Sequence, residues 1–179
     1  MSKKPETTSA SSQQGGRAKR RVEFYKASNY KTDESVGYLM RRILTLIAQG
    51  VERRLEPTGL TNAQWMPMLK LQMGTASTVA ELARGCQLDA GSMTRLLDRL
   101  EAKQLCRRSR SSEDRRVVNL ELTETGRAAA QEIPAALSHV QNVCLEGFTE
   151  DEWLQLRGFL VRILDNAQAH QEANLKNES

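Results

Sequence analysis

Hydrophobic residues recur at three- and four-residue intervals along most of this chain, which is the spacing of amphipathic helices. The first such stretch predicts a helix over about 33–56, which Pro57 and Gly59 should end. A second stretch predicts a helix over about 61–73, opened by a capping box and bent at Pro67. The pattern therefore predicts a mainly helical fold.

Helical spacing returns in the last third of the chain. Thr123 is placed to cap a helix over about 123–146, with a kink at Pro134. Thr149 and Glu152 then form a capping-box pattern ahead of a last helix that should end near residue 170. We expect helices on both sides of a smaller central region.

Two short helices with a tight turn between them are predicted in that central region. The hydroxyl of Thr78 can cap the first helix while Glu81 reaches back to the backbone. Asp89 can cap the second helix, which we expect over 89–103. Taking about 100° per residue, the buried face of this second helix should consist of Met93, Leu96, Leu97 and Leu100.

The opposite face of the second helix is small, hydroxylated and cationic. It carries Gly91, Ser92, Thr94 and Arg95 near the helix start, with Arg99 on its flank. Such a surface suits a DNA major groove, because small residues allow close approach and an arginine can pair bidentately with guanine. We therefore expect this helix to read bases.

A basic hairpin is predicted directly after the second helix. Five arginines fall between residues 107 and 116, on either side of a polar turn, and an alternating strand follows over 117–122. Like charges at this density repel one another, and the repulsion is costly unless an anion usually binds them. The phosphate backbone of DNA is the obvious anion. Two helices and a basic hairpin in this order predict a winged helix-turn-helix.

Four segments in this order and at this spacing resemble the MarR-type transcriptional regulators. They are TVAELA at 78–83, SMTRLLDRLE at 92–101, DRR at 114–116 and LTETG at 122–126. No one of these segments is specific alone, whereas the four together are. The resemblance covers about residues 33–170.

The resemblance implies a homodimer of six-helix subunits that binds double-stranded DNA at a pseudo-palindromic operator. Most such proteins are repressors that a small aromatic ligand or an oxidant releases from DNA. It also implies that Arg116, held by Asp114, enters the minor groove beside Arg115, and Thr78 is placed to contact phosphate. Gln104 departs from the family pattern, which usually has a glycine there, and a non-glycine residue can adopt a positive φ at this position only at some energetic cost.

A pocket for a small-molecule effector is a further implication of the resemblance. It would lie between the DNA-binding part and the dimerising helices and would involve Tyr38, Arg42, Trp65, Met66 and His139. An aromatic acid could stack on Trp65 and pair with an arginine there. Each of these residues has an ordinary core or surface role as its alternative.

Dimerisation is predicted through helices 33–56 and 123–170, because their apolar faces are broader than a small DNA-binding part needs to cover. Two reading helices related by a two-fold axis would enter successive major grooves about 34 Å apart. The alternative is that these helices close on their own subunit. With dimerisation, the DNA target should be an inverted repeat.

Composition and charge distinguish a basic amino-terminal tail from the folded part of the chain. Its 179 residues carry a net charge of +4, and the basic residues gather at the amino terminus and in the hairpin. Residues 1–31 have almost nothing to bury, so we expect a disordered basic tail that either adds non-specific DNA affinity or has no role. The folded domain is expected over 32–171, with its DNA-binding part at 61–122, and a short tail over 172–179.

Membrane proteins, secreted proteins, enzymes and metalloproteins have little support in the sequence. No stretch approaches the roughly 20 apolar residues of a membrane span and the amino terminus lacks a secretory signal, so we expect a cytoplasmic protein without membrane contact. The two histidines and three cysteines show neither catalytic nor metal-binding spacing. No enzymatic activity, cofactor or metal is expected.

Two alternatives stay open at this point. The first is a redox sensor, since the arginines beside Cys106 could favour a thiolate, although neighbours in a strand point to opposite faces. The second is a dimeric helical interaction module whose basic tail and hairpin bind RNA or a protein. Duplex RNA has a deep, narrow major groove that a helix cannot read, which argues against RNA.

Overall fold

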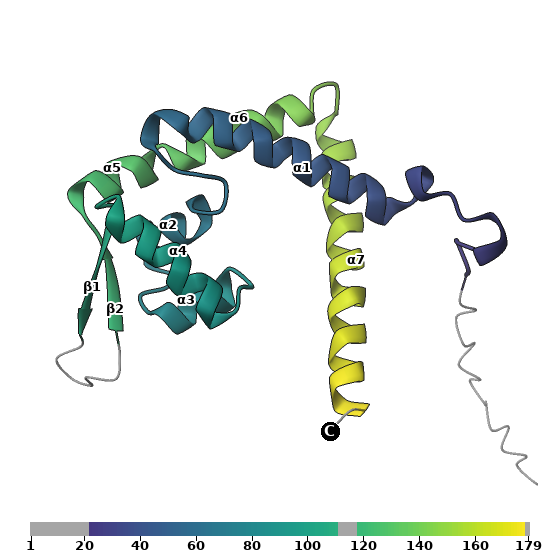
Figure 1. The fold of residues 1–179 in the computed structure, drawn as a ribbon. Coiled ribbons are helices and arrows are strands. Elements are labelled where there is room, and N and C mark those ends of the chain that lie inside the picture. The colour runs from purple at the N-terminus through teal and green to yellow at the C-terminus, as the bar shows by residue number, and fades with distance from the viewer. Residues whose placement is uncertain (1–21, 111–117, 178–179) are drawn as a thin grey trace, which may run out of the picture. The chain divides into compact units, whose positions relative to one another are not determined.

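The structure is a computed structural model that describes residues 22–110 and 118–177. In these residues the chain forms seven α-helices and a two-stranded antiparallel hairpin (Figure 1). The prediction of a mainly helical fold with a hairpin wing is confirmed. The chain divides into two units, of which the first ends at Leu39 and the second begins at Met40.

The first unit holds two single-turn 3-10 helices, Ala27–Asn29 and Thr32–Glu34, and the start of helix α1, which spans Val36–Leu55. Hydroxyl groups secure this helix start. The Ser35 hydroxyl donates to the Thr32 carbonyl at 2.8 Å and accepts the N–H of Tyr38 at 3.3 Å. The N–H of Val36 donates to the Tyr25 hydroxyl at 3.0 Å. Backbone groups that a helix start leaves free are thereby satisfied.

The second unit holds the rest of α1 and every later element. After the 3-10 helix Glu56–Thr58, these are α2 (Trp65–Gln72), α3 (Val79–Gly85), α4 (Ala90–Ala102), β1 (Cys106–Arg110), β2 (Val118–Leu122), α5 (Glu124–Gln131), α6 (Ile133–Cys144) and α7 (Glu150–Asn177). The hairpin register places Arg107 opposite Glu121 and Arg108 opposite Leu120. Chain connections between the central elements are short.

One hydrophobic core is formed by residues of α1, α2, α3, α4, the hairpin, α5 and α6. Its fully buried side chains include Met68, Leu82, Met93, Leu97, Leu100 and Ile133. Gln64 is polar yet buried, and its Oε1 accepts hydrogen bonds from the Thr61 N–H at 3.2 Å and from Lys103 Nζ at 3.0 Å. Lys103 also donates to the Gly59 carbonyl at 2.6 Å. The end of α4 is thereby fastened to the connection between α1 and α2.

Helix α2 begins later than predicted. Residues 61–64 form a turn in which the N–H of Gln64 bonds the Thr61 carbonyl, and the helix itself starts at Trp65. The predicted capping box is half made, because only the Gln64 side chain reaches back to the Thr61 backbone. Pro67 therefore lies in the first turn, where its missing N–H removes no helical hydrogen bond and it does not interrupt the helix.

The helix predicted over 123–146 is two helices. α5 ends at Gln131 and α6 begins at Ile133, with Pro134 in the first turn of α6. Proline cannot donate a backbone hydrogen bond and crowds the carbonyl four residues earlier, so the chain starts a new helix here instead of kinking a continuous one. This break accounts for seven α-helices in the described residues where six were expected.

Helix α7 extends to Asn177, although we predicted an end near residue 170. Residues 159–177 contain neither glycine nor proline, so nothing in the sequence stops the helix there. The capping box predicted at its start is confirmed, because Thr149 and Glu152 each accept the other's backbone N–H. Neither α7 nor any other helix of the described residues is long and apolar enough to cross a membrane.

Candidate nucleic-acid interface

Helix α3 starts as the sequence predicts. Thr78 Oγ1 accepts the N–H of Glu81 at 3.2 Å, and Glu81 Oε2 accepts the N–H groups of Ser77 at 2.8 Å and Thr78 at 3.0 Å. Hydrogen bonds from the Ser77 backbone and then the Thr78 backbone lower the pKa of Glu81. The N–H of Leu120 donates to the Ser77 carbonyl at 2.8 Å, and Thr78 forms an isolated bridge with Asn119. The helix start is thus fixed to β2.

The turn between α3 and α4 places a non-glycine residue in the left-handed region. Gln87 has φ +55°, and the N–H of Leu88 donates to the Ala83 carbonyl at 2.9 Å, a pattern that closes helix C-termini. Asp89 then caps α4 by accepting the N–H of Ser92 at 2.8 Å. Hydrogen bonds from the side chain and then the backbone of Ser92 lower the pKa of Asp89. Both predicted caps are confirmed.

Helix α4 has one buried and one exposed face, as predicted. The buried face consists of Met93, Leu96, Leu97 and Leu100. The other face reaches the surface, with Ser92 half-buried and with Gly91, Thr94, Arg95 and Arg99 exposed. A short, hydroxyl-bearing and cationic strip is therefore open to a partner along the first half of the helix.

The Arg95 side chain forms a hydrogen bond within its own helix. Its Nη2 donates to the Ser92 hydroxyl at 3.1 Å, while the Thr94 hydroxyl donates to the Ala90 carbonyl at 2.8 Å. Both hydrogen bonds are exposed, and an exposed hydrogen bond contributes little net free energy because water can replace it. The guanidinium group can therefore leave Ser92 for another acceptor at low cost.

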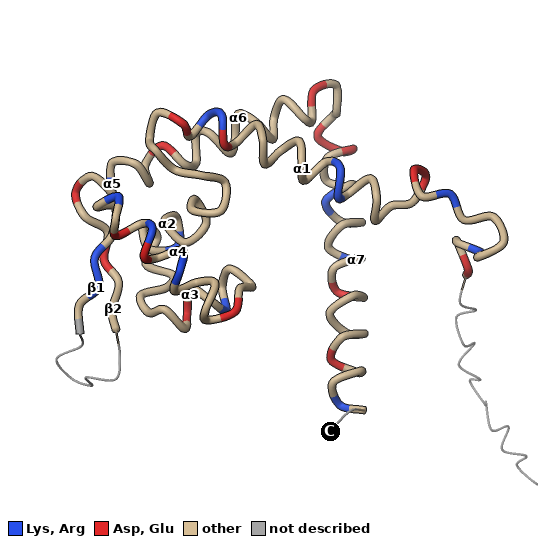
Figure 2. Tube along the Cα trace, viewed as in Figure 1, with Lys and Arg blue, Asp and Glu red and all other residues tan. Residues whose placement is uncertain are grey.

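Two of the five hairpin arginines already have carboxylate partners. Arg107 donates to Glu121 Oε2 from Nε at 3.0 Å and from Nη2 at 2.6 Å. Arg108 pairs with both Asp98 and Glu101 of α4. Figure 2 shows acidic positions beside the basic ones in this region. These two arginines therefore need no external anion, because acids of the same subunit neutralise their charge.

The wing-tip residues Asp114, Arg115 and Arg116 lie outside the described residues, as does the basic tail up to residue 21. The two strands show where the tip connects, because Arg110 lies opposite Val118 in the hairpin register. The predicted minor-groove contacts of the tip stay predictions.

The base of the hairpin is anchored to the start of α5. Gln104 adopts φ +56° although it is not a glycine, and its carbonyl accepts the hydroxyls of Thr123 at 2.6 Å and Thr125 at 2.9 Å. Gly126 lies against Leu105, whose carbonyl oxygen would be 1.8 Å from a Cβ atom at residue 126. The LTETG segment is therefore a packing element.

The sequence pattern does not predict the side chains that hold the interface elements to one another. Lys103 joins the end of α4 to the connection between α1 and α2, and Asp98 and Glu101 join α4 to β1. The one signal in the sequence is the pair of acids in the second half of α4, where the negative end of the helix dipole disfavours them. Thr125 of the LTETG segment is a further such residue, because its hydroxyl donates to the Gln104 carbonyl at the hairpin base.

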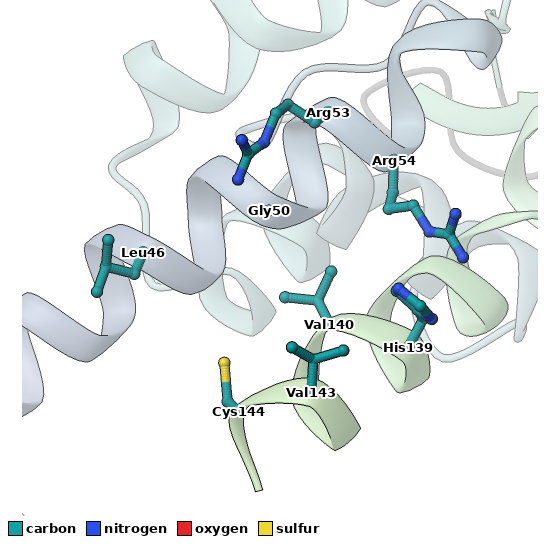
Figure 3. Close-up of a pocket in the computed structure, with 8 residues that line it drawn as sticks. All are labelled: Leu46, Gly50, Arg53, Arg54, His139, Val140, Val143 and Cys144. Atoms are coloured by element: carbon teal, nitrogen blue, oxygen red, sulfur yellow. The ribbon is translucent and has the colours of Figure 1, made fainter. Parts of the chain in front are cut away.

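A hollow of about 310 Å³ lies between the second half of α1 and α6 (Figure 3). Its lining consists of Leu46, Gly50, Arg53, Arg54, His139, Val140, Val143 and Cys144. None of these eight described residues is acidic, and two are arginines. The hollow therefore suits a small molecule with an apolar body and a negative charge.

His139 is the member of the predicted effector group that lines this hollow. Trp65 is half-buried and its Nε1 donates to Asn62 Oδ1 at 3.3 Å. Met66 is exposed in the second unit, as is Arg42, while Tyr38 is half-buried in the first unit. The joint action of these five residues stays a prediction.

The three cysteines differ in accessibility. Cys106 is 2% exposed, and burial followed by the nearby Glu101 carboxylate raises its pKa to about 11. The expectation that adjacent arginines could favour its thiolate is therefore wrong, because burial and an acid outweigh Arg108. Burial likewise raises the pKa of Cys86, whereas Cys144 is exposed at the hollow.

Residues 60–118 match the family model described as the MarR family. The HTH-type transcriptional repressor MdtR of Bacillus subtilis (strain 168) is 30% identical over 122 residues, which are 68% of this chain and 79% of that protein. The residues that match the family model include α2, α3, α4 and the first strand of the hairpin, β1. These are the elements that form the candidate interface.

Two solved structures with bound DNA are similar to this chain. The M. tuberculosis transcriptional regulator MOSR in complex with DNA gives a TM-score of 0.62 at 29% identity, over 76% of this chain and 98% of that one. A mutant of E. coli MarR complexed with operator DNA gives a TM-score of 0.66 at 25% identity, over 72% and 93% of the two chains. The winged helix-turn-helix architecture is shared.

Proposed function

This chain belongs to the MarR family of DNA-binding transcriptional regulators, and from that premise we propose that it is a homodimeric repressor of a pseudo-palindromic operator. The repressor role is supported by the relative MdtR, which is named a transcriptional repressor. The observation that carries the proposal is the exposed strip on α4, where Arg95 and its hydroxyl-bearing neighbours are open to a partner.

Base reading is assigned to the first half of α4. Arg95 can donate two parallel hydrogen bonds to a guanine edge, and Ser92 and Thr94 offer hydroxyls that donate or accept. Gly91 has no side chain to hold the helix away from the base pairs. Arg99 is exposed further along the helix, where it suits a phosphate.

Phosphate and minor-groove contacts are assigned to the flanking elements. Thr78 stands at the start of α3, at the positive end of the helix dipole, which favours an anion. Arg115 and Arg116, with Asp114 holding the latter, are assigned to the wing tip by their place in the family pattern. These contacts position the protein without reading sequence.

Dimerisation is supported by apolar surface that the single subunit leaves open. The exposed large side chains of α1 include Leu39, Ile43, Leu44 and Leu46, and those of α7 include Trp153, Phe159, Leu160, Ile163 and Leu164. None of the described residues 150–177 is buried. Monomeric proteins rarely leave so many large apolar side chains exposed along two helices. A mass in solution of twice the 20.1 kDa chain would support this assignment, and a stable monomer would remove it.

Release by a small anionic ligand is supported by the hollow between α1 and α6. We expect an aromatic carboxylate such as benzoate to bind there and to weaken DNA binding, since Arg54 and His139 stand at one wall. The test compares Arg54→Gln with Arg157→Gln, a matched control on α7 outside the hollow. Loss of the benzoate effect in the first variant alone supports the site, whereas an equal response in both excludes it.

Operator binding is tested by selecting bound fragments from a genomic DNA library and competing the selected duplex. We expect enrichment of an inverted repeat that random duplex DNA displaces poorly and duplex RNA hardly at all. Failure to enrich any sequence would exclude a sequence-specific regulator. Equal displacement by duplex RNA would instead favour the helical interaction module.

A further inference from the structure

Arg108 of strand β1 lies against two acids of helix α4. Its Nη1 is 2.7 Å from Asp98 Oδ1 and also contacts Glu101 Oε2, while Nη2 donates to the Thr94 carbonyl at 3.2 Å. The backbone N–H of Arg108 donates to Glu101 Oε1 at 2.9 Å. The side chain and the backbone N–H of Arg108 are therefore bound to groups that span about two turns of the helix.

The partial burial of this cluster makes it more than a surface ion pair. The side chains of Arg108 and Glu101 are 26% and 29% exposed, and that of Asp98 is 54% exposed. Arginine suits such a position because its planar guanidinium presents five donors in a fixed fork. Lysine could not satisfy two carboxylates and a carbonyl with the same fixed geometry.

Asp98 and Glu101 stand where elementary electrostatics disfavours acids. Both lie in the second half of α4, near the negative end of its dipole, and on a helix assigned to a polyanion. If these residues served only to balance surface charge, removing one of them should strengthen DNA binding. Their pairing with Arg108 indicates a different role.

We propose that Arg108, Asp98 and Glu101 are positioning residues that hold the hairpin at a fixed angle to the reading helix. This inference rests on the proposed function of α4 and deepens it. The cluster sets the separation between the base-reading strip and the wing, so that both fit one operator at once. Asp98 and Glu101 therefore increase sequence preference although they carry the wrong charge for DNA.

A neighbouring ion pair provides the matched control. Arg107 and Glu121 lie opposite one another across β1 and β2, so their pair is internal to the hairpin and does not reach α4. Glu121→Gln removes one carboxylate from the same hairpin without loosening it from the helix. It should leave the ratio of preferred to random DNA affinity unchanged.

The test measures dissociation constants of the full chain for a selected duplex and for a random duplex. In Asp98→Asn and Glu101→Gln we expect the preference ratio to fall about tenfold, through weaker binding to the selected duplex and equal or tighter binding to random DNA. Tighter binding to both duplexes with an unchanged ratio would show simple charge balance and would overturn the proposal.

Arg108→Gln separates positioning from phosphate contact. A positioning residue leaves the dependence of affinity on salt unchanged, whereas loss of a phosphate contact makes that slope shallower by about one. The double variant Asp98→Asn with Arg108→Gln should be little worse than either single variant. A shallower slope, or fully additive losses, contradicts the proposal. If the wild-type chain binds the selected and the random duplex equally well, the proposed function is wrong, and this result is distinct from a failure of the positioning role alone.

Discussion

Gly126 lies so close to Leu105 that a Cβ atom on residue 126 would be 1.8 Å from the Leu105 carbonyl oxygen. The obstacle is backbone, which cannot rotate away as a side chain can. Gly126→Ala should therefore push the start of α5 off the hairpin base and lower the free energy of unfolding by at least about 2 kcal/mol. Denaturant unfolding measures this loss.

Gly158→Ala is the matched control for that substitution. Gly158 lies within α7, and a Cβ atom there meets nothing within 4 Å. Alanine is the better helix former, so the free energy of unfolding should stay equal or rise by up to about 1 kcal/mol. An equal loss in both variants would mean that contact with Leu105 is not the reason for glycine at position 126.

Gln104→Gly should stabilise the protein. A left-handed conformation is unfavourable for a residue with a Cβ atom, and Gln104 holds φ +56° while its carbonyl accepts two hydroxyls. Glycine keeps that carbonyl and removes the strain, so the free energy of unfolding should rise by about 1 kcal/mol. A decrease would indicate that the glutamine side chain itself contributes a contact.

Glu81 should contribute to stability at neutral pH and not in acid. Its pKa is lowered in the folded chain by the backbone N–H groups of Ser77 and Thr78. The folded state therefore favours the ionised form of this side chain more than the unfolded state does. The contribution is present above the ordinary glutamate pKa of about 4.3 and is lost as pH falls through the lower folded pKa.

The measurement compares the wild-type chain with Glu81→Gln in thermal unfolding across pH. The variant should be less stable at pH 7, and the difference should shrink below about pH 4. A difference that is constant with pH would show that the capping carboxylate is not the cause.

Cysteine reactivity should follow burial. Cys106 is almost fully buried with a pKa of about 11, so it should resist alkylation in the native chain, while the exposed Cys144 should react. Mass spectrometry of peptides after brief iodoacetamide treatment checks this, and treatment in urea should label both. Preferential labelling of Cys106 in the native chain would instead support the hypothesis that Cys106 is a redox sensor.

Local patterns of the sequence predicted the reading helix closely. The caps at Thr78 and Asp89 and the four buried positions of α4 all depend on residues within a few positions of one another. Such short-range chemistry is legible in sequence because it needs no knowledge of the tertiary fold.

The features that the sequence did not reveal depend on how separate helices and strands pack against one another. Arg108 reads as one more cation of the wing until α4 brings Asp98 and Glu101 beside it. Lys103 likewise reads as an ordinary helix-end charge, although it bonds Gly59 and Gln64 some forty residues earlier. The kinks predicted at the two helix prolines were wrong for a related reason. A proline that is expected to kink one helix can instead lie in the first turn of another.

The most direct test of base reading by α4 is the affinity of Arg95→Ala for every single-base variant of the selected duplex, beside the wild-type chain. We expect a loss of about 1–3 kcal/mol on the selected duplex and the disappearance of discrimination at one base position, with discrimination kept elsewhere. An equal loss on every duplex, with all base preferences intact, would show Arg95 to be a phosphate contact and would contradict base reading by this residue.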